Sequence, residues 1–353
     1  MSPRFRRGRK GEGPADRFAD APTDGTLLEV DDVRTSFRSD RGLVRAVDGV
    51  TFTLDRSRTI GIVGESGCGK SVLSRSIMGL LPRNAVREGS VRFEGRELIG
   101  EAPDVLRRFW GAQMSMVFQD PMTSLNPVMR IGNQITESIL THFDVTEEYA
   151  NETALSLLTS VGIPEPERRL REYPHQLSGG MRQRVMIAIA LACGPKLLFA
   201  DEPTTALDVT VQAQILDLLA SQQRERYMAV VLVTHDLGVV AGRTDEIAVM
   251  YAGRIVEKAP TKVLFTAMRH PYTEALLASI PKIADPSHTR LQTIGGRPPN
   301  LISPPVGCKF SPRCAYAQDR CRTEDPPLSE PDEHGHQFRC WYPVEITKKP
   351  EVA

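Results

Sequence analysis

The stretch TIGIVGESGCGKSVLSRSIMGLL, residues 59–81, decides the fold class of this chain. A short apolar run leads into GESGCGKS (64–71), and a run with helical spacing follows it. The pattern G-x-x-x-x-G-K-[ST] between a strand and a helix is typical of a phosphate-binding loop. Its glycines let successive backbone N–H groups point at a polyphosphate beside the positive end of the helix. The stretch therefore predicts a nucleotide site in an α/β protein.

The residue types in this loop predict what each would do. We expect Lys70 to reach the β- and γ-phosphates of ATP and the Ser71 hydroxyl to bind Mg²⁺. The remaining contacts are expected from the loop itself, at Gly64, Glu65, Ser66, Gly67, Cys68 and Gly69. For Cys68 the backbone matters here more than the thiol.

A second stretch, KLLFADE (196–202), supplies two carboxylates at the end of a predicted buried strand. An acidic residue at this place can hold Mg²⁺ through water, and its neighbour can polarise the water that attacks the γ-phosphate. We assign the first role to Asp201 and the second to Glu202.

The composition restricts the class of protein further. The 353 residues are 41% hydrophobic and 25% charged, and Lys+Arg and Asp+Glu each total 44. This balance does not indicate nucleic acid as a partner. The longest apolar run, residues 185–193, is far shorter than the ~20 residues that span a bilayer. The N-terminal segment is basic and lacks the apolar stretch of a secretory signal. These features predict a cytosolic protein with reduced thiols.

The texture of the chain predicts three regions. Residues 1–26 are rich in Arg, Gly, Asp and Pro, and we expect them to be a disordered basic tail. From residue 27 to about 285, strand-like and helix-like runs alternate, which favours a parallel sheet in a layered α/β domain. Residues 286–353 contain Pro-rich stretches and clustered cysteines, and we expect a loop-rich extension there.

The stretch LSGGMRQR (177–184) predicts a second anion-binding helix start. Ser178, Gly179 and Gly180 would place a hydroxyl and bare backbone N–H groups at the N-terminus of a long helix. One chain does not need two such sites for one nucleotide. A dimer in which each chain's LSGG covers the nucleotide of the other does need both.

With these motifs in this order, residues 27–345 resemble the nucleotide-binding subunit of an ATP-binding cassette (ABC) transporter. The resemblance implies a RecA-like parallel-sheet core, an antiparallel β subdomain and an α-helical signature subdomain at about 120–190. It also implies roles for single residues. Phe37 would stack on adenine, Gln119 would contact Mg²⁺, Glu202 would be the catalytic base, Asp208 would communicate across the dimer, and His235 would contact the γ-phosphate. Lys70 and Gln119 would join Glu202 and His235 in catalysis.

Several longer stretches resemble the ATPase subunits of bacterial dipeptide and oligopeptide importers, and the first of their two paired ATPases in particular. They include FQDPMTSLNP (118–127), RHPYTEALLASIP (269–281) and GRPPNLISPPVGCKFSPRC (296–314). The resemblance implies a sister ATPase as heterodimer partner, two membrane permeases and an extracytoplasmic binding protein, with no nucleic acid. The chain would then lie at the cytoplasmic face of the membrane as a peripheral subunit. Cargo in this family includes dipeptides, longer peptides and nickel chelates.

Two alternative functions use the same motifs. A soluble ABC ATPase acting outside transport, in DNA repair or translation, shares the phosphate loop and LSGG. Such proteins usually carry two fused cassettes or a long coiled-coil insert, whereas this chain has one cassette and no sustained heptads. A nonhydrolysing iron–sulfur regulatory protein would not need Glu202 and His235.

Four cysteines near the C-terminus form a separate pattern. Their gaps of five, six and eighteen residues are wider than the Cys-x₂₋₄-Cys pairs of structural zinc sites. Zinc stays an alternative, with His334 and His336 completing a mixed site. The importer ATPases that the chain resembles include members with a C-terminal iron–sulfur cluster, commonly of Cys₄ type. The resemblance thus implies a 4Fe-4S cluster with a structural role, ligated by Cys308, Cys314, Cys321 and Cys340. Cys68 and Cys193 are not included, because they belong to the phosphate loop and to a helix end.

Overall fold

The computed structural model describes residue 13 and residues 25–204, 207–280 and 294–345. The chain divides into two compact units. The first includes Asp55–Arg58 and Glu101–Val231, and the second includes Leu27–Leu54, Thr59–Gly100 and the chain from Leu232 onward. The tail predicted over residues 1–26 lies outside the described residues except for residues 13, 25 and 26.

The first unit combines buried parallel strands with a group of helices, as the alternating pattern predicts. Its strands β6 and β7 pair in parallel, and all their residues are buried. Such continuous apolar runs are typical of parallel strands covered on both faces. The strands are β6 (Met114–Val117), β7 (Leu197–Asp201) and β8 (Ala229–Thr234), whose last residues continue into the second unit.

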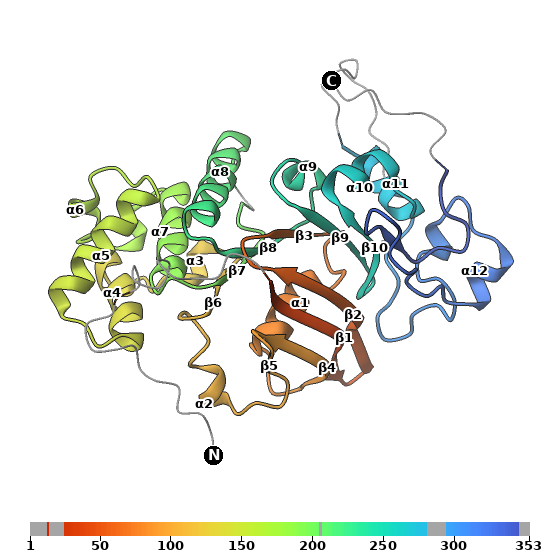
Figure 1. Ribbon diagram of the computed structural model, residues 1–353, viewed down its shortest axis with the longest axis horizontal. Coiled ribbons are helices and arrows are strands. Elements are labelled where there is room, and N and C mark those ends of the chain that lie inside the picture. Colours follow the sequence, from red (N-terminus) through yellow and green to blue (C-terminus); the bar gives the residue numbers. More distant parts are fainter. Residues whose placement is uncertain (1–12, 14–24, 205–206, 281–293, 346–353) are drawn as a thin grey trace. The chain divides into compact units, whose positions relative to one another are not determined.

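The helices of the first unit include the region that carries the signature motif. Helices α4, α5 and α7 pack on one another (yellow to green in Figure 1). The helices of this unit are α2 (Pro103–Leu106), α3 (Pro121–Ser124), α4 (Ile131–His142), α5 (Glu147–Ser160), α6 (Pro166–Arg169), η2 (Pro174–Gln176), α7 (Gly179–Leu191) and α8 (Val209–Glu225).

The second unit contains a mixed sheet and an antiparallel sheet. In the mixed sheet, β9 (Glu246–Tyr251) pairs in parallel with β3 (Thr59–Val63) and antiparallel with β10 (Arg254–Pro260). The antiparallel sheet has the order β2-β1-β4-β5, and its strands are red to orange in Figure 1. They are β1 (Thr26–Ser39), β2 (Gly42–Asp55), β4 (Ala85–Phe93) and β5 (Arg96–Glu97). The α/β class with both kinds of sheet is confirmed.

The C-terminal region of the second unit, residues 294–345, contains little helix or strand, as predicted. It packs on the mixed sheet, because β11 (Gln337–Phe338) pairs antiparallel with β10. The helices of this unit are α1 (Lys70–Met78), α9 (Leu237–Val240), α10 (Thr261–Ala267), α11 (Pro271–Ala278), η3 (Ser311–Arg313) and α12 (Asp319–Thr323).

A buried cation attaches this region to strand β2. The Nζ of Lys309 donates to Asp48 Oδ2 at 2.7 Å and to Ala252 O at 2.9 Å. Arg254 donates to the same carboxylate at 2.9 Å. The Lys309 and Asp48 side chains are only 7% and 9% exposed. Burial alone would raise the pKa of Asp48, but the hydrogen bonds and ion pairs with Lys309 and Arg254 lower it to about 2.

We expect Lys309→Met to lower the free energy of unfolding by about 2 kcal/mol, because removing one partner of a buried ion pair leaves charge uncompensated. The loss is limited because Arg254 remains beside Asp48 and still compensates its charge. Urea titration of the full chain measures it. Lys262→Met, at an exposed position of α10, is the matched control, and equal stability of the two variants would contradict this account.

The same ion pair predicts a pH dependence. Because the pKa of Asp48 is about 2 in the fold and 3.8 ordinarily, its stabilising contribution is complete above pH 3.8. It is lost as the pH falls from 3.8 toward 2. The difference in stability between wild type and Lys309→Met should therefore shrink over that window.

Candidate active site

The phosphate loop joins β3 to α1, and two of its glycines have no room for a side chain. A Cβ on Gly64 would lie 2.1 Å from the carbonyl oxygen of Met250. One on Gly69 would lie 2.2 Å from the carbonyl oxygen of Ala46, and Gly69 also has a φ of +107°. Gly67 stands in open space but has a φ of +79°, a conformation that glycine adopts without strain. The loop therefore needs glycine at Gly64 and Gly69 for lack of space, and at Gly67 for its backbone conformation.

Lys70 lies against the inside of this loop. Its side chain is buried, and its Nζ donates to Gly64 O at 2.7 Å and to Glu65 O at 3.1 Å. A phosphate bound in the loop would compete with these carbonyls for the ammonium. Ser71 follows as the second residue of α1 and is half-buried. The structure thus brings the predicted lysine to the predicted loop.

Glu202 and Gln119 meet in the first unit. Glu202 directly follows β7, whose last residue, Asp201, is buried. The Nε2 of Gln119 donates to Glu202 Oε2 at 3.1 Å. Glu202 has a φ of +47°, which costs a residue with a side chain about 1–2 kcal/mol. Strained backbone of this kind concentrates at active sites, where the fold holds it in place.

The signature motif begins a helix as predicted. Ser178 is the N-cap of α7, and its hydroxyl accepts from Met181 N at 3.3 Å. Ser178 and Gly179 are exposed, and Gly180 is half-buried. Asp208 caps α8 in the same way by accepting from Val211 N at 2.9 Å. Both helix starts therefore offer backbone N–H groups to solvent.

The other predicted residues lie in the second unit. His235 follows β8 and is exposed, so it is not a core histidine. Phe37 lies in β1, is half-buried and pairs with Ala85 of β4. The phosphate loop belongs to this unit as well, whereas Gln119, Asp201, Glu202 and the signature belong to the first. Each unit thus carries one part of the predicted site.

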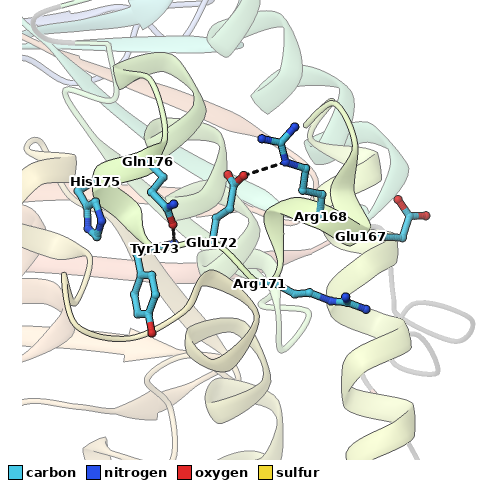
Figure 2. A pocket seen from close by; sticks show the side chains of 7 residues that line it. All are labelled: Glu167, Arg168, Arg171, Glu172, Tyr173, His175 and Gln176. Atoms are coloured by element: carbon cyan, nitrogen blue, oxygen red, sulfur yellow. Dashed lines mark hydrogen bonds and ion pairs between the residues drawn. The ribbon is translucent and has the colours of Figure 1, made fainter.

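A hollow of about 790 Å³ lies in the first unit, just before the signature motif in the sequence (Figure 2). Two contacts order its wall, Arg168 Nε to Glu172 Oε1 at 3.1 Å and Tyr173 N to Gln176 Oε1 at 2.8 Å. Basic and acidic side chains are balanced, which does not suit a polyphosphate. The lining residues are Glu167, Arg168, Arg171, Glu172, Tyr173, His175 and Gln176.

The four C-terminal cysteines line one cavity in the second unit. The cavity has about 10 Å³ of room, close to what one water molecule needs. Burial raises the pKa of Cys308 to about 11 and that of Cys340 to about 12, and the neighbouring thiols add to both shifts. Burial also raises the pKa of Cys314. These thiols are therefore protonated unless a cationic group accompanies them.

The two histidines of the zinc alternative lie elsewhere. His336 is buried, with its Nε2 2.7 Å from Oε1 of the buried Glu257. His334 is exposed and lies 3.5 Å from Glu333. Neither lines the cavity, so these two residues do not fit the alternative of a mixed cysteine–histidine zinc site. Within the described ranges, no group of three or more His, Cys, Asp or Glu side chains is arranged to hold a metal ion.

One histidine that does line the cavity was not singled out as a site residue, although it lies in the stretch 269–281. His270 is the N-cap of α11, and its Nδ1 accepts from Tyr272 N at 3.1 Å. Burial lowers the pKa of His270 to about 4, so the ring is neutral at physiological pH. Because its Nδ1 is engaged in the cap, His270 has a structural role.

The position of Cys193 agrees with the sequence. Cys193 is buried after the end of α7, where its Sγ donates to Ser138 O at 3.2 Å. Among the helices of the described segments, none has the length and apolar character needed to cross a membrane.

Two family models match the chain. The model described as "ABC transporter" matches residues 47–205, which include the phosphate loop and LSGG. The model described as "Oligopeptide/dipeptide transporter, C-terminal region" matches residues 256–321 and so contains Cys308, Cys314 and Cys321.

Curated relatives match over most of their length. The dipeptide transport ATP-binding protein DppD of Escherichia coli (strain K12) is 48% identical over 328 residues, covering 92% of this chain and 99% of the relative. The oligopeptide transport ATP-binding protein OppD of Bacillus subtilis (strain 168) is 47% identical over 317 residues, covering 89% and 88%.

Solved structures share the fold over two thirds of the chain. The ATP-binding cassette MJ0796, in a dimeric post-hydrolysis state with ADP and Pi, has a TM-score of 0.61 at 27% identity, covering 67% of this chain and 99% of that one. The structure of cbiO1 from Clostridium perfringens has a TM-score of 0.58 at 27% identity, covering 68% and 90%.

The crowding at Gly64 gives a direct test of the loop. We expect Gly64→Ala to weaken ATP binding by tenfold or more, because a Cβ 2.1 Å from a backbone oxygen forces the loop to shift, at a cost of about 1–3 kcal/mol. Titration calorimetry with MgATP measures the change. The control is Gly95→Ala, whose φ is +75° but whose Cβ would meet nothing within 4 Å. Unchanged ATP affinity in Gly64→Ala would contradict the assignment of the loop.

Proposed function

This chain belongs to the ATP-binding subunits of the oligopeptide and dipeptide ABC transporters, and on that premise we propose how its residues share the work. It is an ATPase that energises the import of di- and oligopeptides. The alternative of an ABC ATPase outside transport is not favoured, because the relatives and the C-terminal model are of transporters. The contact between Gln119 and Glu202 at the end of a buried strand supports the hydrolytic role best.

ATP would bind with its phosphates in the loop of the second unit. Lys70 would exchange its two loop carbonyls for β- and γ-phosphate oxygens, and Phe37 would stack on adenine. The donors for Mg²⁺ are of the right chemistry, since hydroxyl, amide and carboxylate oxygens suit this hard cation. Ser71, Gln119 and Asp201 would hold it. When bound, Mg²⁺ would neutralise charge on the phosphates.

Glu202 would accept the proton of the attacking water. Its carboxylate is buried beside Gln119, which keeps one of its oxygens in a fixed direction. Fixed positioning and charge stabilisation supply most of the catalysis in phosphoryl transfer. His235, at the end of β8, would contact the γ-phosphate.

The exposed N-terminus of α7 would serve a second nucleotide. Ser178, Gly179 and Gly180 would cover the ATP of a sister ATPase in a heterodimer, and Asp208 would communicate across the interface. Exposed apolar side chains near Gln119 support a further interface in the first unit, at Phe118, Met122 and Val128, which are 39%, 64% and 80% exposed. These residues would contact the two permeases at the cytoplasmic face of the membrane. An extracytoplasmic binding protein would deliver the peptide.

We expect Glu202→Gln to retain MgATP and to lower the rate of hydrolysis by about 10²-fold or more, because an amide cannot take the proton. The amide keeps the shape of Glu202, so binding should persist. Phosphate release and ATP binding are measured in the assembled importer. Glu148→Gln, at an exposed position of α5, is the control. Hydrolysis at a near wild-type rate would mean that Glu202 is not the base.

The cysteine cavity would hold an iron–sulfur cluster of 4Fe-4S type, with zinc as the alternative. The donor set fits a thiolate-ligated group, since four thiols, two of them from one loop, line one cavity and Cys₄ ligation is common for such clusters. A cationic group would also stabilise thiolates whose pKa burial raises. The cavity has room for about one water, so the thiols must move apart to accept a cluster. Ligation would tie η3, α12 and the Cys340 segment together.

Anaerobic purification followed by iron and sulfide analysis tests this ligand set. We expect about four iron atoms per chain, and loss of most of them in Cys314→Ser. The matched control is Cys193→Ser, whose thiol lies in the first unit against Ser138 O. Stoichiometric zinc without iron would defeat the cluster, and unchanged iron in Cys314→Ser would defeat the ligand assignment.

A further inference from the structure

Arg313 reaches from the cysteine-bearing loop to the phosphate loop. It is the last residue of η3 and directly precedes Cys314. Its Nη1 donates to Glu65 Oε2 at 2.6 Å, and its Nη2 donates to Glu65 Oε1 at 2.8 Å. The Arg313 side chain is 3% exposed and that of Glu65 is 26% exposed. This is a bidentate, charge-assisted pair, which is the strongest kind of arginine–carboxylate contact.

The remaining donors of Arg313 are also engaged. Its Nε donates to Gly295 O at 2.8 Å, and Nη2 donates to Ile294 O at 3.2 Å. The guanidinium lies 5.8 Å from the ring centre of Tyr251, within reach of a cation–π contact. These contacts fix the guanidinium plane before any nucleotide arrives. The hydrogen bond with Glu65 raises the pKa of Arg313, so it stays charged.

The C-terminal half of the second unit holds the backbone of Glu65 as well. Glu65 N donates to the hydroxyl of Tyr272 at 2.9 Å, and Tyr272 is fully buried. The ring of Phe310 lies 5.3 Å from that of Tyr272 and 5.2 Å from that of Tyr251. Phe310 stands between Cys308 and Arg313 in the sequence. The loop that carries two of the cavity's cysteines thus packs against the residues that hold Glu65.

We propose that Arg313 is a positioning residue of the ATP site, which neutralises Glu65 and fixes the phosphate loop in the shape that binds a polyphosphate. The reason is electrostatic. Glu65 places a carboxylate in a loop whose ligand is polyanionic, and without Arg313 that charge would repel the phosphates. The bidentate pair removes the repulsion and holds the loop at its second residue.

A second consequence is a coupling between the cysteine cavity and the ATP site. Since Cys314 follows Arg313 directly, a change at this thiol acts on the segment that holds Glu65. Coupling of binding equilibria is reciprocal, so we expect ATP binding to stabilise the arrangement of this loop and thereby to lower the accessibility of its thiols. The inference rests on the proposed binding of ATP at the phosphate loop and does not depend on which group the cysteines hold.

The test is a double-variant cycle on the full chain, read by titration calorimetry with MgATP. We expect Arg313→Met to bind MgATP about tenfold more weakly, because the carboxylate of Glu65 would then repel the phosphates. Arg313→Lys should recover part of the loss, because a lysine restores the charge without the bidentate geometry. In the Glu65→Gln background, Arg313→Met should change affinity by less than about threefold, since no carboxylate is left to neutralise. Arg322→Met, an exposed arginine of α12, should bind like wild type.

Two results would overturn the proposal. One is wild-type affinity in Arg313→Met while Lys70→Ala loses MgATP, which would leave the proposed ATP site intact and remove Arg313 from it. The other is an equal loss from Arg313→Met in the wild-type and Glu65→Gln backgrounds, which would show a general effect on folding. Loss of binding in neither Lys70→Ala nor Arg313→Met would instead reject the ATP site itself.

The coupling has its own readout on the metal-free chain. We expect MgATP to slow the reaction of the cavity thiols with an aromatic disulfide reagent in wild type. This protection should disappear in Arg313→Met at saturating MgATP, and it should persist in Arg322→Met. Equal protection in both variants would contradict a route through Arg313.

Discussion

The absence of room beside Gly64 and Gly69 is the constraint on which the second unit depends. A Cβ added to Gly64 would lie 2.1 Å from the backbone oxygen of Met250, and one added to Gly69 would lie 2.2 Å from that of Ala46. The phosphate loop is therefore pressed between β9 and β2, and its shape is set by backbone from both sheets. Lys70 lies inside the same loop. A nucleotide site built on backbone contacts needs little rearrangement when a ligand binds.

Buried charged and polar side chains join distant parts of the second unit. Lys309 pairs with Asp48 at 2.7 Å, His336 with Glu257 at 2.7 Å, and Arg313 with Glu65 through two contacts. Each pair joins a C-terminal residue to the sheets or to the phosphate loop. The extension has few apolar residues with which to form its own hydrophobic core. These pairs attach it to the rest of the second unit. Removing Lys309 alone would leave the buried Asp48 carboxylate with fewer cationic partners.

Sequence patterns predicted the parts of the site that are local in the chain. The phosphate loop, the carboxylates after β7 and the helix cap at Ser178 each follow from a few neighbouring residues. The pair between Arg313 and Glu65 spans 248 positions, and no periodicity or motif connects them. Histidine is a common metal ligand, which made His336 a candidate, but in the fold its Nε2 lies 2.7 Å from Glu257 Oε1. Long-range pairing of charges depends on tertiary packing, which local pattern does not contain.

The central claim is that this chain is an ATPase subunit of a peptide importer and hydrolyses ATP efficiently only within the assembled complex. Phosphate release by the purified chain, compared with release by the importer assembled in vesicles with its sister ATPase, permeases and binding protein, tests it most directly. The account predicts slow hydrolysis by the single chain, because its own LSGG helix start would serve the ATP of another subunit. It predicts a large rise on assembly and a further rise with peptide. Full, peptide-stimulated hydrolysis by the single chain would contradict it.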